Sequence, residues 1–265
     1  MFMSFLVAAI ALTVVAALWI ILMRNVPVGE ELPPAEPITK YLGVAIKNRN
    51  VWFIAIAYGL TLGTTTQFCS ILPSALELGM GIEMQTAGTM ASVITIGSFF
   101  ACFAAPAWVM WRGKNKPFLI WSTILGAVVM GVNWFVPLGP AMWTVLILNG
   151  FFSALSGPVI EAMIPMLPGI GTKYAGSAGG LNTTIGVLMA YFIPIIIAAC
   201  CGDNWVLNLM VCAVLFAASL IPILFLPETG KNGKLAKEGK LGLPGEDLDV
   251  KIGVNEFPGE ANELK

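Results

Sequence analysis

Residues 175–201 read AGSAGGLNTTIGVLMAYFIPIIIAACC, a run of small and apolar side chains without a single charge. About 20 mostly apolar residues in a helix are enough to cross the hydrocarbon core of a bilayer, which is about 30 Å thick. In lipid the backbone must satisfy its own hydrogen bonds, which a helix does within one segment. The stretch therefore predicts a transmembrane α-helix.

Six further segments share this composition. The seven predicted spans cover residues 3–23, 51–74, 87–111, 117–137, 141–166, 175–201 and 205–226. Hydrophobic residues make up 57% of the chain and charged residues 11%, whereas a soluble domain has about 25% charged residues. The sequence thus predicts an all-α, polytopic transmembrane helical bundle whose surroundings are the lipid bilayer of the plasma or inner cell membrane.

The basic residues separate the loops into two classes. All Lys and Arg residues lie after the first, third, fifth or seventh span, and the remaining loops contain none. Cytoplasmic loops carry the excess of Lys and Arg in membrane proteins. We therefore expect a multi-pass chain with its N-terminus outside and its C-terminus in the cytoplasm.

The spans divide into one and six. A single helix, residues 1–23, is followed by a Pro-rich cytoplasmic linker, residues 24–50, through which a continuous helix is not expected. Residues 51–227 form the predicted six-helix bundle. Residues 228–265 are rich in Gly, Lys and Glu, a composition that predicts a disordered cytoplasmic tail.

Several classes of function lack the side chains that they need. The chain has no His, which excludes a His-ligated metal site, a His general base and a His proton relay. The net charge of −1 argues against a nucleic-acid partner. Five cysteines lie in apolar stretches without a Cys-x-x-Cys pair and are interpreted as small buried hydrophobes. We expect no metal, no cofactor and no enzymatic activity.

Four features, taken in order, carry a resemblance to a known family. A cytoplasmic linker divides one helix from six, and the basic turn WRGKNKP follows at residues 111–117. The stretch GPVIEAMIPMLPGIGTKYAGSAGGLN covers residues 157–182, and LPETG stands at residues 226–230. Over residues 1 to about 230 the chain resembles the C-terminal half of a major facilitator superfamily (MFS) transporter, preceded by that family's sixth helix.

The resemblance implies a transporter of twelve helices with the solute pathway between two halves. This chain would pair with a separate N-terminal-half membrane polypeptide or a second copy, or would be a truncated form. The implied function is secondary-active transport of a small polar or anionic solute by alternating access. The basic turn lacks the family's Asp, so the resemblance assigns no gating contact to its cytoplasmic-loop residues Arg112 and Lys114.

Polar side chains within the spans are the candidates for contact with a solute, because in the bilayer core they face a cavity or a neighbouring helix. Gln67 is the first choice, since its amide both donates and accepts hydrogen bonds. An interhelical hydrogen bond is the alternative for this side chain. The predicted substrate-binding residues are Tyr58, Gln67, Asn149, Asn182 and Tyr191.

Glu161 is the only acidic residue within a predicted span. One interpretation is a carboxylate that couples transport to protons. The other is a helix-end carboxylate at the membrane interface that pairs with Lys116 or Lys173. No Lys or Arg lies within a span, so a fixed cation for an anionic solute would come from the other half.

Two pairs of glycines have the small-x-x-x-small spacing that permits close helix approach. Gly59 and Gly63 form one pair, and Gly176 and Gly180 form the other. We expect both pairs to lie at helix–helix contacts.

Two other functions remain open at this stage. A seven-helix receptor or sensor has the same topology, although no span contains a Lys for a retinal Schiff base and the cytoplasmic loops are short. An intramembrane enzyme is the third alternative, for which the spans offer no convincing catalytic set.

Overall fold

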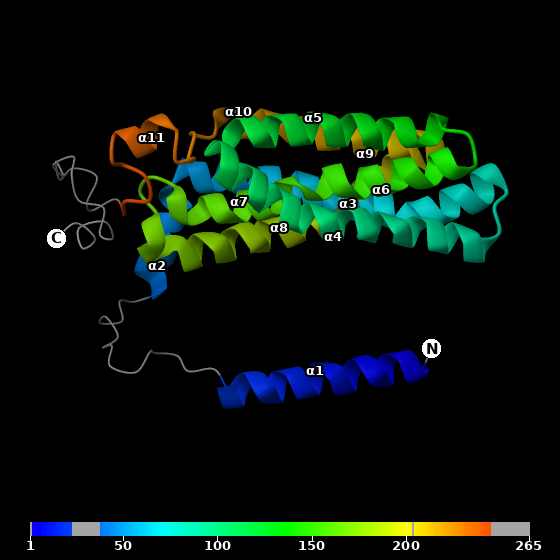
Figure 1. The fold of residues 1–265 in the computed structure, drawn as a ribbon, viewed down its shortest axis with the longest axis horizontal. Coiled ribbons are helices and arrows are strands. Elements are labelled where there is room, and N and C mark those ends of the chain that lie inside the picture. Colours follow the sequence, from blue (N-terminus) through cyan, green and yellow to red (C-terminus); the bar gives the residue numbers. More distant parts are fainter. Residues whose placement is uncertain (1, 23–37, 203, 245–265) are drawn as a thin grey trace. The chain divides into compact units, whose positions relative to one another are not determined.

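The computed structural model describes residues 2–22, 38–202 and 204–244, and the chain divides into two units, Met1–Pro37 and Ile38–Lys265. Within the described residues the regular structure is helical throughout (Figure 1). The predicted all-α class is confirmed. Residues 23–37 of the predicted linker and 245–265 of the predicted tail lie outside the described residues.

The first unit contains one helix, α1 (Phe2–Leu22). It coincides with the first predicted span, and its stretch Ala9–Leu22 is apolar. The Thr13 hydroxyl donates to the carbonyl of Ala9, one turn earlier, at 2.8 Å. The one described hydroxyl of this helix is thereby satisfied within the helix, as an apolar environment requires.

The second unit is a bundle of long helices that run side by side (Figure 1). Its elements are α2 (Ile38–Lys47), α3 (Arg49–Met80), α4 (Met84–Arg112), α5 (Lys116–Val132), η1 (Asn133–Phe135), α6 (Pro140–Ala154), α7 (Ser156–Met163), η2 (Ile164–Met166), α8 (Gly171–Cys201), α9 (Trp205–Ala218), α10 (Leu220–Phe225) and α11 (Lys234–Lys237). Short turns join most of them.

Five stretches of the described chain are long and apolar enough to cross a membrane. They are Met84–Arg112, Lys116–Phe135, Pro140–Met166, Gly171–Cys201 and Trp205–Phe225. These stretches match the third to seventh predicted spans, so the polytopic helical bundle is confirmed. The membrane crossings of α1 and α3 stay predictions.

α3 has the length of a span but a more polar sequence than those five. It has 32 residues, and the run from Thr64 to Gln67 lowers its hydropathy. α3 packs against α4, α8, α9 and α10, and its Thr61, Thr64 and Gln67 side chains are buried. Because other helices cover these groups, their polarity is not exposed to lipid.

Two of the predicted spans are each broken into two helices. α6 ends at Ala154 and α9 ends at Ala218, four residues before Pro158 and Pro222 respectively. A proline inside a helix lacks its N–H and its ring clashes with the carbonyl four residues earlier. Each break thus coincides with a proline, whereas Pro73, Pro106 and Pro194 lie inside helices that stay continuous.

The loops that the charge pattern assigns to the cytoplasm meet at one end of the bundle. The Asn48 side-chain amide donates to the carbonyl of Pro168 at 2.9 Å, and the N–H of Gly169 donates to the carbonyl of Leu243 at 2.9 Å. These bonds join segments more than 70 residues apart in sequence. Spans that alternate in direction place every second loop on the same side of the membrane. The loops after the first, third, fifth and seventh spans are therefore expected to meet at one end of the bundle.

Glu228 caps the beginning of α5. Its carboxylate accepts hydrogen bonds from the backbone N–H groups of Asn115 (2.8 Å), Lys116 (3.2 Å) and Gly230 (2.8 Å). The first N–H groups of a helix lack partners within the helix, and the positive end of its dipole favours a carboxylate. The neighbouring Thr229 is fully buried and accepts a bond from the Asn115 amide at 2.9 Å.

The structure differs from the predicted disordered tail over residues 228–244. Glu228 and Thr229 hold the turn between α4 and α5, and the N–H of Asn232 donates to the carbonyl of Gly113 at 2.9 Å. The short helix α11 follows. The composition of these polar residues predicts a solvated tail, but in the structure they join the loops at the end of the bundle.

Candidate functional site

An open cleft of about 280 Å³ lies between the α7–η2 segment and the first half of α8. Its walls are formed by one acidic side chain, two polar ones and four small or apolar residues: Glu161, Asn182, Thr183, Ile164, Pro165, Ala175 and Gly179. Two of the predicted site residues, Glu161 and Asn182, therefore share one cleft.

Small side chains on α8 make room for this cleft. Ala175, Gly179 and Thr183 are spaced by four residues, so they form one stripe along the helix. An added Cβ at Gly179 would meet no heavy atom within 4 Å in the described chain. The stripe leaves open space where larger side chains would fill it.

Tyr58 lies on α3, which packs against both α7 and α8, but it is not among the residues that line the cleft. The Tyr58 side chain interacts electrostatically with Glu161 on α7. Its ring occupies the space beside Gly186 on α8, where an added Cβ would lie 2.5 Å from Tyr58 Cδ1. The absence of a side chain at Gly186 thus allows Tyr58 to lie against α8.

Asn182 offers an unused hydrogen-bond acceptor at the cleft. The residue is 1% exposed, and its Oδ1 has no hydrogen-bond partner among the described residues. A buried polar atom without a partner costs about 1–3 kcal/mol. A hydrogen-bond donor brought to this atom would remove the cost.

The cleft presents acceptors and hydroxyls, and Glu161 is the one charged residue among those that line it. A solute that donates hydrogen bonds fits this set of groups. An anionic solute would need a cation supplied from beyond the lining residues. Among the described residues, no three His, Cys, Asp or Glu side chains gather as a metal site would require.

Gln67 lies in a buried contact between α3 and α9 and does not line the cleft. Its Nε2 donates to Asn208 Oδ1 at 3.1 Å, and the two residues are 5% and 1% exposed. This is the interhelical hydrogen bond that the sequence leaves open as the alternative. Asn208 was not among the predicted residues, although it is the one amide side chain in the predicted span 205–226.

Asn149 and Tyr191 are also outside the cleft. Asn149 on α6 is 1% exposed, and its Oδ1 has no partner in the described chain. Its neighbour Gly150 lies against the backbone of α4. Tyr191 lies further along α8, is 65% exposed, and contacts Phe192 edge to face with ring centroids 5.3 Å apart.

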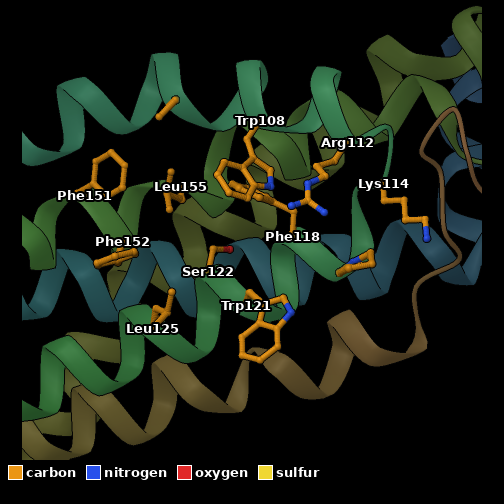
Figure 2. A pocket seen from close by; sticks show the side chains of 12 residues that line it. Trp108, Arg112, Lys114, Phe118, Trp121, Ser122, Leu125, Phe151, Phe152 and Leu155 are labelled. Carbon is orange, nitrogen blue, oxygen red and sulfur yellow. The ribbon is translucent and has the colours of Figure 1, made fainter.

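Arg112 and Lys114 lie at the turn between α4 and α5. The Arg112 guanidinium carbon lies 5.7 Å and 5.1 Å from the ring centroids of Trp108 and Trp111, which is cation–π geometry. Both basic residues line a second cavity of about 540 Å³ (Figure 2). This cavity shares no lining residue with the cleft.

Comparisons with known proteins locate the fold. No family model matches the chain. An uncharacterised protein of Archaeoglobus fulgidus is 29% identical over 206 residues, which are 76% of this chain and 89% of that protein. Among solved structures, the chain is similar to a crystal structure of the MFS transporter FucP in its outward conformation, with a TM-score of 0.58 and 16% identity.

The match to FucP covers 81% of this chain and 52% of FucP, so the chain spans about half the length of that transporter. At 16% identity the likeness concerns the fold and does not extend to solute or mechanism. The described residues adopt an all-α, polytopic helical fold similar to that of an MFS transporter.

Proposed function

We propose that this chain is one half of a secondary-active transporter that moves a small polar or anionic solute across the cell membrane by alternating access. The presence of Glu161, Asn182 and Thr183 on the walls of one open cleft carries the proposal. Polar groups are costly in a bilayer and mark solute or ion pathways where they face a cavity. The likeness to FucP supports the architecture that such a pathway needs.

Each cleft residue has a role in this proposal. Asn182 and Thr183 hydrogen-bond the solute. We assign proton coupling to Glu161, the one charged residue among those that line the cleft.

The second half of the pathway would come from another membrane polypeptide or from a second copy of the chain. Gly179 lines the cleft on α8, with Gly176 and Gly180 nearby on the same helix, and an added Cβ at any of them would meet nothing within 4 Å in the described chain. Small residues allow a helix to approach closely in a membrane. A partner packed here would enclose the cleft and could supply a cation for an anionic solute.

The two matches differ in how much of each protein this chain covers. The chain spans about half of FucP, whereas the Archaeoglobus fulgidus relative is covered over 89% of its own length. In this assembly α1 plays the part of the sixth helix, and the N-terminus lies outside, as the positions of the basic residues predict.

Uptake into proteoliposomes tests the site. The chain, purified with any associated membrane polypeptide, is assayed against a panel of radiolabelled sugars, amino acids and carboxylates. We expect Asn182→Ala to raise the apparent KM about tenfold, as loss of a hydrogen bond in a desolvated site does. Thr183→Val is expected to raise it several-fold.

Thr184→Val is the matched control, because Thr184 does not line the cleft and its hydroxyl already bonds the Gly180 carbonyl at 2.8 Å. Glu161→Gln should remove acceleration by a proton gradient while solute exchange continues. Unchanged kinetics in all three cleft variants would contradict the proposed site.

Co-purification tests the half-transporter part separately. Mild detergent extraction followed by mass measurement should recover a complex with a second membrane polypeptide or a homodimer. A lone monomer that transports would show that the site is right and the assembly is wrong. A lone monomer that binds a ligand without moving it would favour the receptor alternative.

A further inference from the structure

The larger cavity, of about 540 Å³, opens between α4, α5 and the end of α6 and has mainly apolar walls. Trp108 lies on α4, Trp121 and Leu125 lie on α5, and Phe151 and Phe152 lie on α6. Figure 2 shows these aromatic and aliphatic side chains facing a common space. Such walls fit a hydrocarbon group better than a sugar or an amino acid.

One end of the cavity is cationic. Arg112 and Lys114 lie at this end, and Phe151, Phe152 and Leu125 lie at the other (Figure 2). The cavity is therefore amphipathic along its length, with positive charge where the helices meet the loop and apolar side chains deeper in the bundle.

The two charges are available to a ligand. Neither forms an ion pair with a carboxylate of the described chain. Glu228 is the carboxylate in contact with this turn, and both of its oxygens accept hydrogen bonds from backbone N–H groups. Lys116 is differently placed, since its ammonium donates to the carbonyl of Leu224 at 2.6 Å.

Tryptophans mark the depth of this cavity in the bilayer. Trp108 and Trp121 are 49% and 65% exposed although they line it. Tryptophan is enriched where membrane helices reach the headgroup region, and basic loops lie on the cytoplasmic side. The cationic end is thus at the level of lipid headgroups, and the apolar end is at the level of acyl chains.

We propose that this cavity binds an anionic phospholipid, with its phosphate on Arg112 and Lys114 and one acyl chain between α4, α5 and α6. A basic pocket between membrane helices on the cytoplasmic side suits such headgroups. A free phosphate would use only the cationic end, and a zwitterionic lipid would place a positive group beside the two cations. The site is separate from the transport cleft and does not depend on the proposed solute.

Native mass spectrometry of the full chain in detergent tests the charge of the ligand. Phosphatidylglycerol and phosphatidylcholine with identical acyl chains are titrated in parallel. We expect phosphatidylglycerol to bind at least about tenfold more tightly, and the double variant Arg112→Gln/Lys114→Gln to bring the two affinities close together.

The double variant Lys237→Gln/Lys240→Gln is the matched control. It removes the same charge from the exposed region around α11, which does not line the cavity. It should retain the preference for phosphatidylglycerol. Equal affinities for the two lipids in the unmodified chain, or an equal loss in both double variants, would overturn the proposal.

A third arm tests the apolar end. Leu125→Trp places a larger side chain in the acyl region at a residue that is 41% exposed, and it should weaken phosphatidylglycerol binding several-fold. Glycerol phosphate, which lacks acyl chains, should not displace the lipid at equal concentration. Displacement by glycerol phosphate, or unchanged binding in Leu125→Trp, would show that the apolar walls take no part.

Discussion

Two pairs of glycines share one spacing and differ in their surroundings. At Gly59 and Gly63 an added Cβ would press against α8 side chains, whereas at Gly176 and Gly180 it would meet nothing within 4 Å in the described chain. Close packing is confirmed for the first pair. The spacing thus indicates a surface that a helix can approach, but the tertiary structure decides whether a helix of the same chain does so.

The two halves of α8 differ in the same way. In its second half, Met189 and Ile193 pack against the glycines of α3. In its first half, small residues line the cleft beside Glu161. One helix therefore combines a contact that holds the bundle together with a surface that we assign to a solute and a partner.

A larger side chain at the closely packed pair, Gly59 and Gly63, should have the largest effect on stability. In Gly63→Leu the new Cβ would lie 2.7 Å from Ile193 Cδ1 and 3.0 Å from the Met189 carbonyl oxygen. Overpacking a close contact typically costs 1–3 kcal/mol and occasionally more, so we expect the free energy of unfolding to fall by about 3 kcal/mol. Denaturant unfolding in bicelles measures it.

Gly176→Leu provides the comparison, since its side chain would enter open space. Its unfolding free energy should change by less than about 0.5 kcal/mol. Similar losses of unfolding free energy in Gly63→Leu and Gly176→Leu would mean that the two glycine pairs do not differ in how closely they are packed.

The next prediction concerns the pair with open surroundings, Gly176 and Gly180, and its effect on assembly. Gly180→Leu should leave the stability of the isolated chain unchanged but weaken assembly with the other half about tenfold, because the bulky side chain prevents close helix approach. Fluorescence energy transfer between labelled halves in liposomes measures the assembly. Undiminished assembly would show that the open surface does not receive a partner.

A smaller effect is expected at the buried α3–α9 contact. Gln67→Leu removes the bond to Asn208 Oδ1, and an interhelical hydrogen bond in a membrane is worth about 0.6 kcal/mol on average. We expect a loss of about 1 kcal/mol in the free energy of unfolding, since Asn208 is left without its partner.

The double variant Gln67→Leu/Asn208→Leu should recover most of that loss, because no polar group then remains unpaired. The apparent KM for uptake should remain unchanged in both variants. A raised KM in Gln67→Leu would restore Gln67 as a solute ligand.

Much of the fold follows from hydropathy alone. The third to seventh predicted spans agree with the helices because apolar length is a local property of sequence. The break after Ala154 also coincides with a local feature, Pro158. The cap that Glu228 provides for α5 was not predicted, since it joins residues 112 positions apart and depends on how the loops meet.

The candidate site could be predicted only in part. Polarity within a span identifies Gln67 and Asn182 equally well, because it does not show what each side chain faces. The structure places Gln67 against Asn208 and Asn182 at an open cleft. Tyr58 lies against α8 because Gly186 lacks a side chain, and a contact of that kind needs the helix packing to be known.

The carboxylate cap on α5 also has a consequence for the order of events during synthesis. Glu228 is made 112 residues after Lys116, an interval on the order of 10 s at synthesis rates of about 5–20 residues per second. During that interval the first turn of α5 lacks its acceptor, and the turn after α4 lacks the segment that holds it. Glu228 and Thr229 therefore complete a loop made much earlier, and this end of the bundle stays open until they have been made.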